Sequence, residues 1–260
     1  MSRTQKIIKN LAIAFAIFLI ITIFSSILTG IYAITQIFGK NDIGELKTYE
    51  VESFQSLVID IKYTNINIKK SDKYIVETNN SNIEIESSDN KLKISEKNHN
   101  LFKQNMGEIT IYIPANLDEV KINNGAGSLY IESLITNKLN LNLGAGETII
   151  DNIEANNCSI DSGIGSFKIN DGKLNDLNFD MGVGKTTITA LISGNSNLDT
   201  GIGNLELNLI GDDYKLKINK GIGKVIVDKR QVKDNEVIGD GHNNISISGG
   251  VGTIKIDYKK

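Results

Sequence analysis

The chain has 260 residues, of which 40% are hydrophobic, and it contains 24 glycines, one proline, one cysteine and no tryptophan. This composition is typical of an ordered protein that is rich in strands and turns. The single cysteine excludes an intramolecular disulfide and a zinc site built from several thiolates. Residues 41–260 hold 24 basic and 31 acidic side chains, and this negative balance argues against nucleic acid as a partner.

The N-terminal region contains a long apolar run. Residues 11–38 include no charged side chain, and a helix of that length exceeds the roughly 30 Å hydrocarbon thickness of a bilayer. We therefore predict one transmembrane helix at residues 11–38. Arg3, Lys6 and Lys9 precede it without an acidic residue, so the positive-inside rule places residues 1–10 in the cytoplasm.

The rest of the chain is then expected to face outward. Residues 39–52 are predicted to be a linker, and residues 53–260 an extracytoplasmic domain of a single-pass cell-membrane protein. A cleaved signal peptide is the alternative, because a basic segment followed by an apolar run fits that pattern too. The run is longer than usual for a signal peptide, and Ile31-Tyr32-Ala33 has a bulky residue where a cleavage site needs a small one. These features favour an uncleaved anchor.

A Gly-x-Gly motif repeats along the second half of the chain. The steps between motifs are 19, 19, 19, 19, 20 and 29 residues, and such a regular period is the signature of a solenoid of stacked repeats. The motifs begin at Gly125, Gly144, Gly163, Gly182, Gly201, Gly221 and Gly250.

The residues around each motif alternate between apolar and polar. Leu177 and Phe179 precede one motif and Thr186 and Ile188 follow it, at places that are mostly apolar in the other repeats. Period-two alternation predicts half-buried strands, and the change of parity across the glycines predicts a corner. A further column also steps by 19 residues and contains Leu134, Ile153, Gly172, Leu191 and Ile210.

We therefore predict an all-β fold, a parallel β-solenoid of about 19 residues per coil. Right-handed coiling is favoured by the general preference of parallel crossovers, and left-handed coiling remains open. Residues 119–260 are predicted to form the regular coils. Residues 53–118 alternate similarly without the repeated glycine pairs, and we predict irregular first coils or a small capping sheet there.

Two expectations concern the C-terminal end of the chain. The 29-residue step contains the polar stretch DKRQVKDNEVIGDGHNN, which we predict to be a surface loop. Lys255, Lys259 and Lys260 lie near the end of the chain, and we expect them to protect an exposed last strand from pairing with other chains.

The sequence Gly184-Lys185-Thr186 resembles part of a phosphate-binding loop. Such a loop needs a glycine five residues earlier and a helix afterwards. Position 179 is Phe, and the residues that follow are β-branched, which favours a strand. We interpret Gly182-Val183-Gly184 as a structural corner with Lys185 facing water and Thr186 facing inward, and we predict no nucleotide site.

Three carboxylates share the place two residues before a first glycine. Asp161, Asp180 and Asp199 lie one coil apart in the predicted stack, where they repel each other unless they are solvated or bridged by a cation. They are therefore a weak candidate for a calcium site. The alternative, which we favour, is that these side chains bind the backbone of the adjacent turn. No cofactor is expected.

Other residues with catalytic potential have structural explanations. Cys158 shares an inward column with Leu139 and Leu177, so we expect a buried core residue. His99 and His242 lie far apart in polar stretches and form no recognisable triad or metal pattern. A polysaccharide-cleaving enzyme would need converging carboxylates, whereas the acidic residues here are scattered over outward columns. We predict no enzymatic activity.

The strand segments IDIKYTNINIKKSD, NKLKISEK and GEITIYIP, followed by the Gly-x-Gly strands, resemble the bacterial "putative adhesin" family built on β-strand repeats, a domain of unknown function. The resemblance covers about residues 54–260. It implies a membrane-anchored protein of the cell envelope and supplies no catalytic residue.

We thus expect a non-enzymatic, membrane-anchored bacterial surface protein whose solenoid is an adhesin-like binding or scaffolding module. Cell-wall polymer or another envelope protein would be its partner. The alternative is an accessory regulatory subunit of an envelope-stress sensing system, in which the transmembrane helix makes the decisive contact. Exchanging that helix for an unrelated one separates the two, because adhesion would survive the exchange and regulation would not.

Overall fold

The computed structural model describes residues 44–97, 107–113 and 116–259, together with Phe15, Phe18, Thr22 and Ser25. The chain divides into two compact units, Met1–Asp42 and Ile43–Lys260. The predicted transmembrane helix lies outside the described residues except for the four single ones, which are helical. In the part of the chain that the structure describes, no helix is long and apolar enough to cross a membrane.

The second unit is built from strands that pair into one continuous sheet. The strands are β1 (Lys47–Glu50), β2 (Ser56–Ile61), β3 (Asn65–Lys70), β4 (Ile75–Thr78), β5 (Ile83–Ser88), β6 (Lys91–Glu96), β7 (Glu108–Ile113), β8 (Leu117–Ala126), β9 (Leu129–Asp161), β10 (Ile164–Asn175), β11 (Leu177–Ser193), β12 (Asn195–Ile210), β13 (Tyr214–Asn219), β14 (Ile222–Val227), β15 (Arg230–Gln231), β16 (Glu236–Ile238), β17 (Asn243–Ser248) and β18 (Val251–Lys259).

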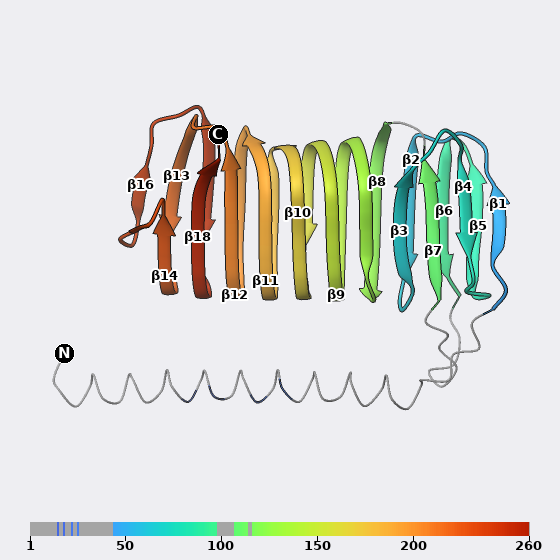
Figure 1. The fold of residues 1–260 in the computed structure, drawn as a ribbon, viewed down its shortest axis with the longest axis horizontal. Coiled ribbons are helices and arrows are strands. Elements are labelled where there is room, and N and C mark those ends of the chain that lie inside the picture. Colours follow the sequence, from blue (N-terminus) through green and yellow to red (C-terminus); the bar gives the residue numbers. More distant parts are fainter. Residues whose placement is uncertain are drawn as a thin grey trace. The chain divides into compact units, whose positions relative to one another are not determined.

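Strands β9 to β12 wind as regular parallel coils. Gly165 pairs with Gly146 on one side and with Gly184 on the other, and Gly184 pairs in turn with Gly203. Successive partners are 19 residues apart in the sequence, so equivalent residues of successive coils lie side by side (Figure 1). The predicted β-solenoid and its period are confirmed, and the handedness of the coiling stays a prediction.

The glycine corners let these coils approach closely. A Cβ atom on Gly184 would lie 1.8 Å from the carbonyl oxygen of Gly165, and Gly184 has a φ of +145°. A side chain does not fit in this space, and the backbone conformation is one that glycine adopts readily. β11 continues through the corner as a strand, which confirms the structural interpretation of the residues before Lys185.

The interior is filled by the predicted inward columns. Leu177 and Phe179 are 1% and 0% exposed. Phe167 of the preceding coil packs against Phe179, with 5.3 Å between the ring centroids. Burying such a side chain stabilises the fold by about 1.5–3 kcal/mol. Because one coil cannot bury its own apolar side chains, this stabilisation depends on the stacking of neighbouring coils.

One inward column departs from the 19-residue step. The register between β10 and β11 shifts after Ile169. As a result Ala190 is fully buried, whereas Leu191 is 37% exposed. The predicted column through Leu191 and Ile210 is therefore wrong by one residue, because Ala190 and its register partner Leu209 fill that place.

The first coil turns its corner without glycine. The Glu96 carboxylate accepts hydrogen bonds from the backbone N–H groups of Lys62 at 2.7 Å and Tyr63 at 3.0 Å. It also accepts from the hydroxyl of Thr64 at 3.2 Å and from the side-chain amide of Asn80 at 3.1 Å. Thr64 and Asn80 are buried. A charged acceptor therefore satisfies the backbone donors of this corner, where the regular coils use glycine.

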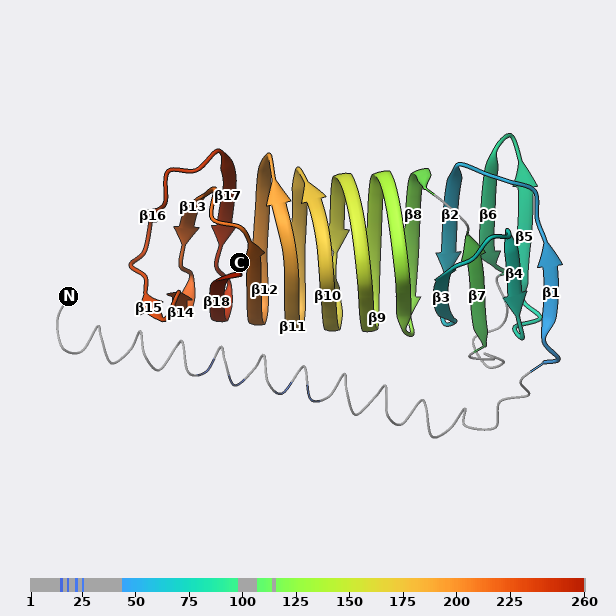
Figure 2. The ribbon, with the colours of Figure 1, turned by 45° about the horizontal axis from the view of Figure 1, so that its top comes forward.

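The last coil of the chain is not the last coil of the stack. β17 pairs with β12 and β13, and β18 pairs with β12 and β14. The C-terminal coil is therefore inserted between its two predecessors, as both views show (Figure 1, Figure 2). The expectation that these lysines protect an exposed last strand is wrong for Lys255, because β18 pairs with β12 on one side and, as far as Ile256, with β14 on the other. Lys259 has a register partner on the β12 side only. Lys260 lies outside the described residues.

The polar stretch before β17 forms the outermost strands at this end. β15 pairs with β14, and β16 pairs with β13, in both cases antiparallel. Between them Val232 is only 2% exposed. The stretch predicted to be a surface loop thus includes two short strands that cover the C-terminal end of the stack.

The N-terminal coils are interleaved in the same way. β2 pairs with both β6 and β8, and β3 pairs with both β7 and β9, so the first coil lies between the second coil and the regular coils. The strands of residues 53–118, predicted to be irregular first coils or a small capping sheet, thus do not stack in chain order. The predicted linker at 39–52 needs a correction, because β1 within it pairs with β4.

Candidate functional site

The strands that precede the glycine corners present a continuous polar surface. Its residues form two outward columns whose members are register partners in adjacent coils, as Asn178 is with Ser159 and Asn197. We call this surface the polar face. Its residues are Lys121, Asn123, Asn140, Asn142, Ser159, Asp161, Asn178, Asp180, Asn197, Asp199, Lys217, Asn219, Ser246 and Ser248.

The three candidate carboxylates lie next to one another on this face. Asp180 is the register partner of both Asp161 and Asp199, and all three are exposed. Burial raises the pKa of Asp180 above its ordinary value, and the charges of Asp199 and Asp161 raise it further. The backbone N–H of Gly163 donates to the Asp161 carboxylate at 3.4 Å, which is the turn interaction expected of an Asx side chain.

The calcium hypothesis gains no geometric support. Within the described ranges, no group of three or more His, Cys, Asp or Glu side chains is arranged to hold a metal ion. The weak candidate formed by Asp161, Asp180 and Asp199 therefore stays a prediction.

Amide side chains link equivalent positions of neighbouring coils on and beside the polar face. Asn142 donates to Asn123 at 2.8 Å, and Asn244 donates to Asn195 at 3.1 Å. Asn142 also donates to Asn140 at 3.2 Å, and Asn244 also donates to the backbone carbonyl of His242 at 3.4 Å. The face therefore offers similar hydrogen-bonding groups in every coil, at the strand spacing of about 4.8 Å.

The other residues that drew attention in the sequence have structural roles. Cys158 is 3% exposed, and burial raises the pKa of its thiol to about 12, which confirms the core assignment. Lys185 is exposed and Thr186 is buried, as predicted. The ring of His242 lies 3.1 Å from an Asp213 carboxylate oxygen in an exposed pair. His99 lies outside the described residues.

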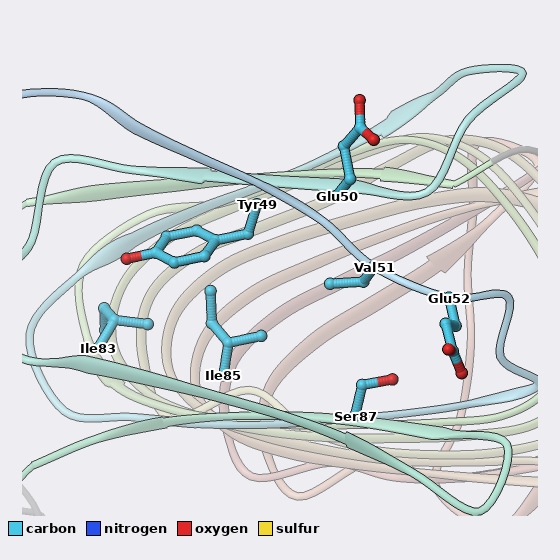
Figure 3. Close-up of a pocket in the computed structure, with 7 residues that line it drawn as sticks. All are labelled: Tyr49, Glu50, Val51, Glu52, Ile83, Ile85 and Ser87. Carbon is cyan, nitrogen blue, oxygen red and sulfur yellow. The ribbon is translucent and has the colours of Figure 1, made fainter.

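Sequence reasoning missed a second feature, an opening at the N-terminal end of the stack. Tyr49 and Val51 on one side face Ile83, Ile85 and Ser87 on the other across a space of about 420 Å³ (Figure 3). A smaller opening of about 230 Å³ lies beside it and shares Tyr49 and Ile83. We call the two together the N-terminal cleft.

The signal for this cleft is a short alternation within the predicted linker. Tyr49 and Val51 are apolar, whereas Thr48, Glu50 and Glu52 are polar. Such a pattern is typical of a strand with one apolar side. It is too short to be recognised as a strand without knowledge of its pairing with β4.

Comparison with known proteins gives one family match. The family model described as Toastrack DUF4097 matches residues 54–256. None of the curated proteins matches the chain.

Solved structures resemble the chain at low identity. A "putative adhesin" from Bacteroides fragilis is 19% identical, with 82% of this chain and 96% of that chain covered and a TM-score of 0.48. A "putative cell adhesion protein" from Clostridium sporogenes is 15% identical, with 83% and 99% covered and a TM-score of 0.33. A "putative lipid binding protein" from Parabacteroides distasonis is 15% identical, with 83% and 97% covered and a TM-score of 0.37.

Proposed function

The chain belongs to the Toastrack DUF4097 family, and from this premise we propose that it is a non-enzymatic, adhesin-like binding module of the bacterial cell surface. We further propose that it binds a repeating polar polymer of the cell wall through the polar face. The observation that carries this proposal is the stacking of like polar residues, such as Asn178 on Asn197, in successive coils. A surface that repeats in equal steps suits a ligand that also repeats.

The chemistry of the polar face supports binding without catalysis. Its carboxylates are Asp161, Asp180 and Asp199, which stack in one column. All three are exposed to solvent, whereas a catalytic acid or base is commonly held in an enclosed site that adjusts its pKa to the reaction. Cys158 is buried and therefore out of reach of a substrate.

The test is the binding of the full-length chain, kept in solution with a mild detergent, to purified cell-wall polymer in a sedimentation assay. Asn178→Ala with Asn197→Ala removes one amide from each of two adjacent rows of the face, and we expect binding to weaken by roughly tenfold. The control is Lys168→Ala with Thr187→Ala, an outward register pair on the strands after the corner. An equal loss of polymer binding in both double variants would contradict a role for the polar face.

Membrane anchoring is also a proposal, and the absence of charge from residues 11–38 supports it. Carbonate washing of cell membranes should leave the full-length chain in the membrane fraction. External protease should digest residues 44–260 of intact protoplasts and spare a tag placed before Arg3. Release of the chain by carbonate would overturn the proposed anchor and leave the proposed binding function intact.

A further inference from the structure

The two ends of the stack differ in whether their outer strand edges are paired. At the C-terminal end, β15 and β16 pair with the outer edges of β14 and β13. At the N-terminal end, β1 pairs with β4 and β5 pairs with β6, and among the described residues no strand pairs with their other edges. The backbone N–H and C=O groups along those edges are available to a further strand.

Apolar side chains from β5, from β1 and from the residue that follows β1 line the N-terminal cleft. Tyr49 and Val51 lie opposite Ile83 and Ile85 (Figure 3). Tyr49 is 40% exposed, and Val51, Ile83 and Ile85 are partly buried. The interior of the solenoid is therefore open at this end, and an additional strand along either edge would place every second side chain into it.

Charge distinguishes the two edges. On β5, Glu84 lies 2.8 Å from Lys97 and Glu86 lies 3.0 Å from Lys93, so both acids already have a basic partner. In contrast, Glu50 at the end of β1 is exposed, and it forms no ion pair with any described residue.

Two further acids extend this charge along the β1 side. Glu45 lines the smaller opening and Glu52 lines the larger one, and both are exposed and likewise without a described ionic partner. Of the described residues that line the cleft, Lys47 is the only basic one. The β1 edge therefore combines free backbone groups, an apolar inner side and an acidic outer side.

We propose that the N-terminal cleft binds an extended peptide segment of alternating apolar and basic residues, which adds to the free edge of β1 as a further strand. Its apolar side chains would pack between Tyr49 and Ile85, and its basic side chains would lie beside Glu50 and Glu52. This mode is β-augmentation, in which main-chain hydrogen bonds provide affinity and alternate side chains provide specificity. The site is separate from the polar face.

Two other occupants fit the cleft less well. An acyl chain could fill the apolar space, but it has no backbone donors or acceptors to pair with the strand edges and no positive charge to complement Glu50 and Glu52. A second copy of the chain, docked by the same end, would bring two acidic rims together, and like charges that face each other are unfavourable. An extended basic peptide can both pair with the free backbone groups and complement the acidic residues of the rim.

The test uses the full-length chain in a mild nonionic detergent and a fluorescein-labelled octapeptide of alternating valine and lysine, with binding followed by fluorescence anisotropy. Two further peptides are controls. One replaces lysine by glutamate, and the other carries N-methyl groups on alternate residues, which removes the donors needed for strand pairing. We expect each control peptide to bind at least about tenfold more weakly than the valine–lysine peptide.

A charge reversal on the protein completes the test. Glu50→Lys with Glu52→Lys should weaken binding of the valine–lysine peptide by at least about tenfold and strengthen binding of the valine–glutamate peptide. Asp212→Lys with Asp240→Lys makes the same change of net charge in exposed loops before β13 and after β16 and should leave both affinities unchanged.

Three outcomes would overturn the proposal. The first is equal binding of the N-methylated peptide, which would rule out strand addition. The second is the same loss of binding in both charge-reversed proteins, which would reduce the effect to net charge. The third is a dimer of the wild-type chain in light scattering that Glu50→Lys with Glu52→Lys dissociates, because the cleft would then belong to a second copy. None of these outcomes bears on wall-polymer binding by the polar face.

Discussion

Adjacent residues on one strand have opposite surroundings in this fold. Leu177 is 1% exposed and belongs to the shared interior, whereas Asn178 beside it is exposed on the polar face. Substitutions at the two kinds of position therefore have different consequences. Inward residues determine whether the stack forms, and outward residues determine what it can bind.

Leu177→Asp should lower the free energy of unfolding by several kcal/mol, because it places an unpaired charge in the buried column. Lys185→Ala changes an exposed side chain on the same strand and should alter stability by less than about 0.5 kcal/mol. Urea denaturation followed by circular dichroism measures both. Similar midpoints for the two variants would contradict the assignment of the inward columns.

Glu96→Ala should destabilise the first coil by about 1–3 kcal/mol, because the backbone N–H groups of Lys62 and Tyr63 lose their acceptor. Glu96→Gln keeps one carbonyl acceptor and should therefore reduce the stability of the first coil by less than Glu96→Ala. Denaturation midpoints of the two variants give the comparison. A larger loss of stability in Glu96→Gln than in Glu96→Ala would contradict the role assigned to the carboxylate.

Asp180→Asn should raise the melting temperature at neutral pH. The pKa of Asp180 is raised in the fold, so over the acidic range of its titration the folded chain binds more protons than the unfolded chain, and stability increases as the pH falls. Above the folded pKa, the ionised carboxylate is unfavourable because of its partial burial and its two acidic neighbours. The advantage of asparagine should therefore shrink as the pH is lowered through the carboxylate range. A pH-independent advantage would contradict this explanation.

The coils were predictable from the sequence where they stack in the same order as they follow one another along the chain. The corners at Gly144, Gly163, Gly182 and Gly201 are spaced by 19 residues, and the structure places them in that order. The position of the final coil was not predictable in this way. The Gly221 and Gly250 corners have the same local pattern, so local sequence does not distinguish an outer coil from an inserted one.

The remaining differences also arise from tertiary contacts. Leu191 is as apolar as a core residue, and its exposure follows from a one-residue register shift after Ile169. The polar face was predictable from the alternation of apolar and polar residues, because outward positions such as Asn178 are polar. The N-terminal cleft was not, because Tyr49 and Ile85 face each other only after β1 and β5 have joined different partners.

Deletion of residues 243–260 tests the inserted coil. Without β17 and β18, the strands β13 and β14 lose the strands that connect them to β12. We expect residues 214–227 to lose protection in hydrogen exchange, although they are still present in the chain. In a stack that followed the chain order, those residues would still pair with β12 and would remain protected, and that result would contradict the interleaved arrangement.

The whole unit behaves as a stack whose length sets the length of its polar face. Each regular coil adds one inward set of apolar residues and one outward row of polar ones, so stability and binding surface grow together. Residues 145–163 form one such repeat, because Ala145 and Ile164 are register partners. Insertion of a second copy of these residues after residue 163 preserves the Gly-x-Gly corner.

The most direct measurement is the affinity of this lengthened full-length chain for the purified cell-wall polymer. An added row that carries Ser159 and Asp161 should strengthen binding, whereas the same insertion with alanine at both places should leave the affinity at the wild-type value. Melting temperatures of both lengthened chains should equal or exceed that of the wild type. A folded, lengthened chain that binds the polymer no better than the wild type would contradict the proposal that the repeating polar face is the binding surface.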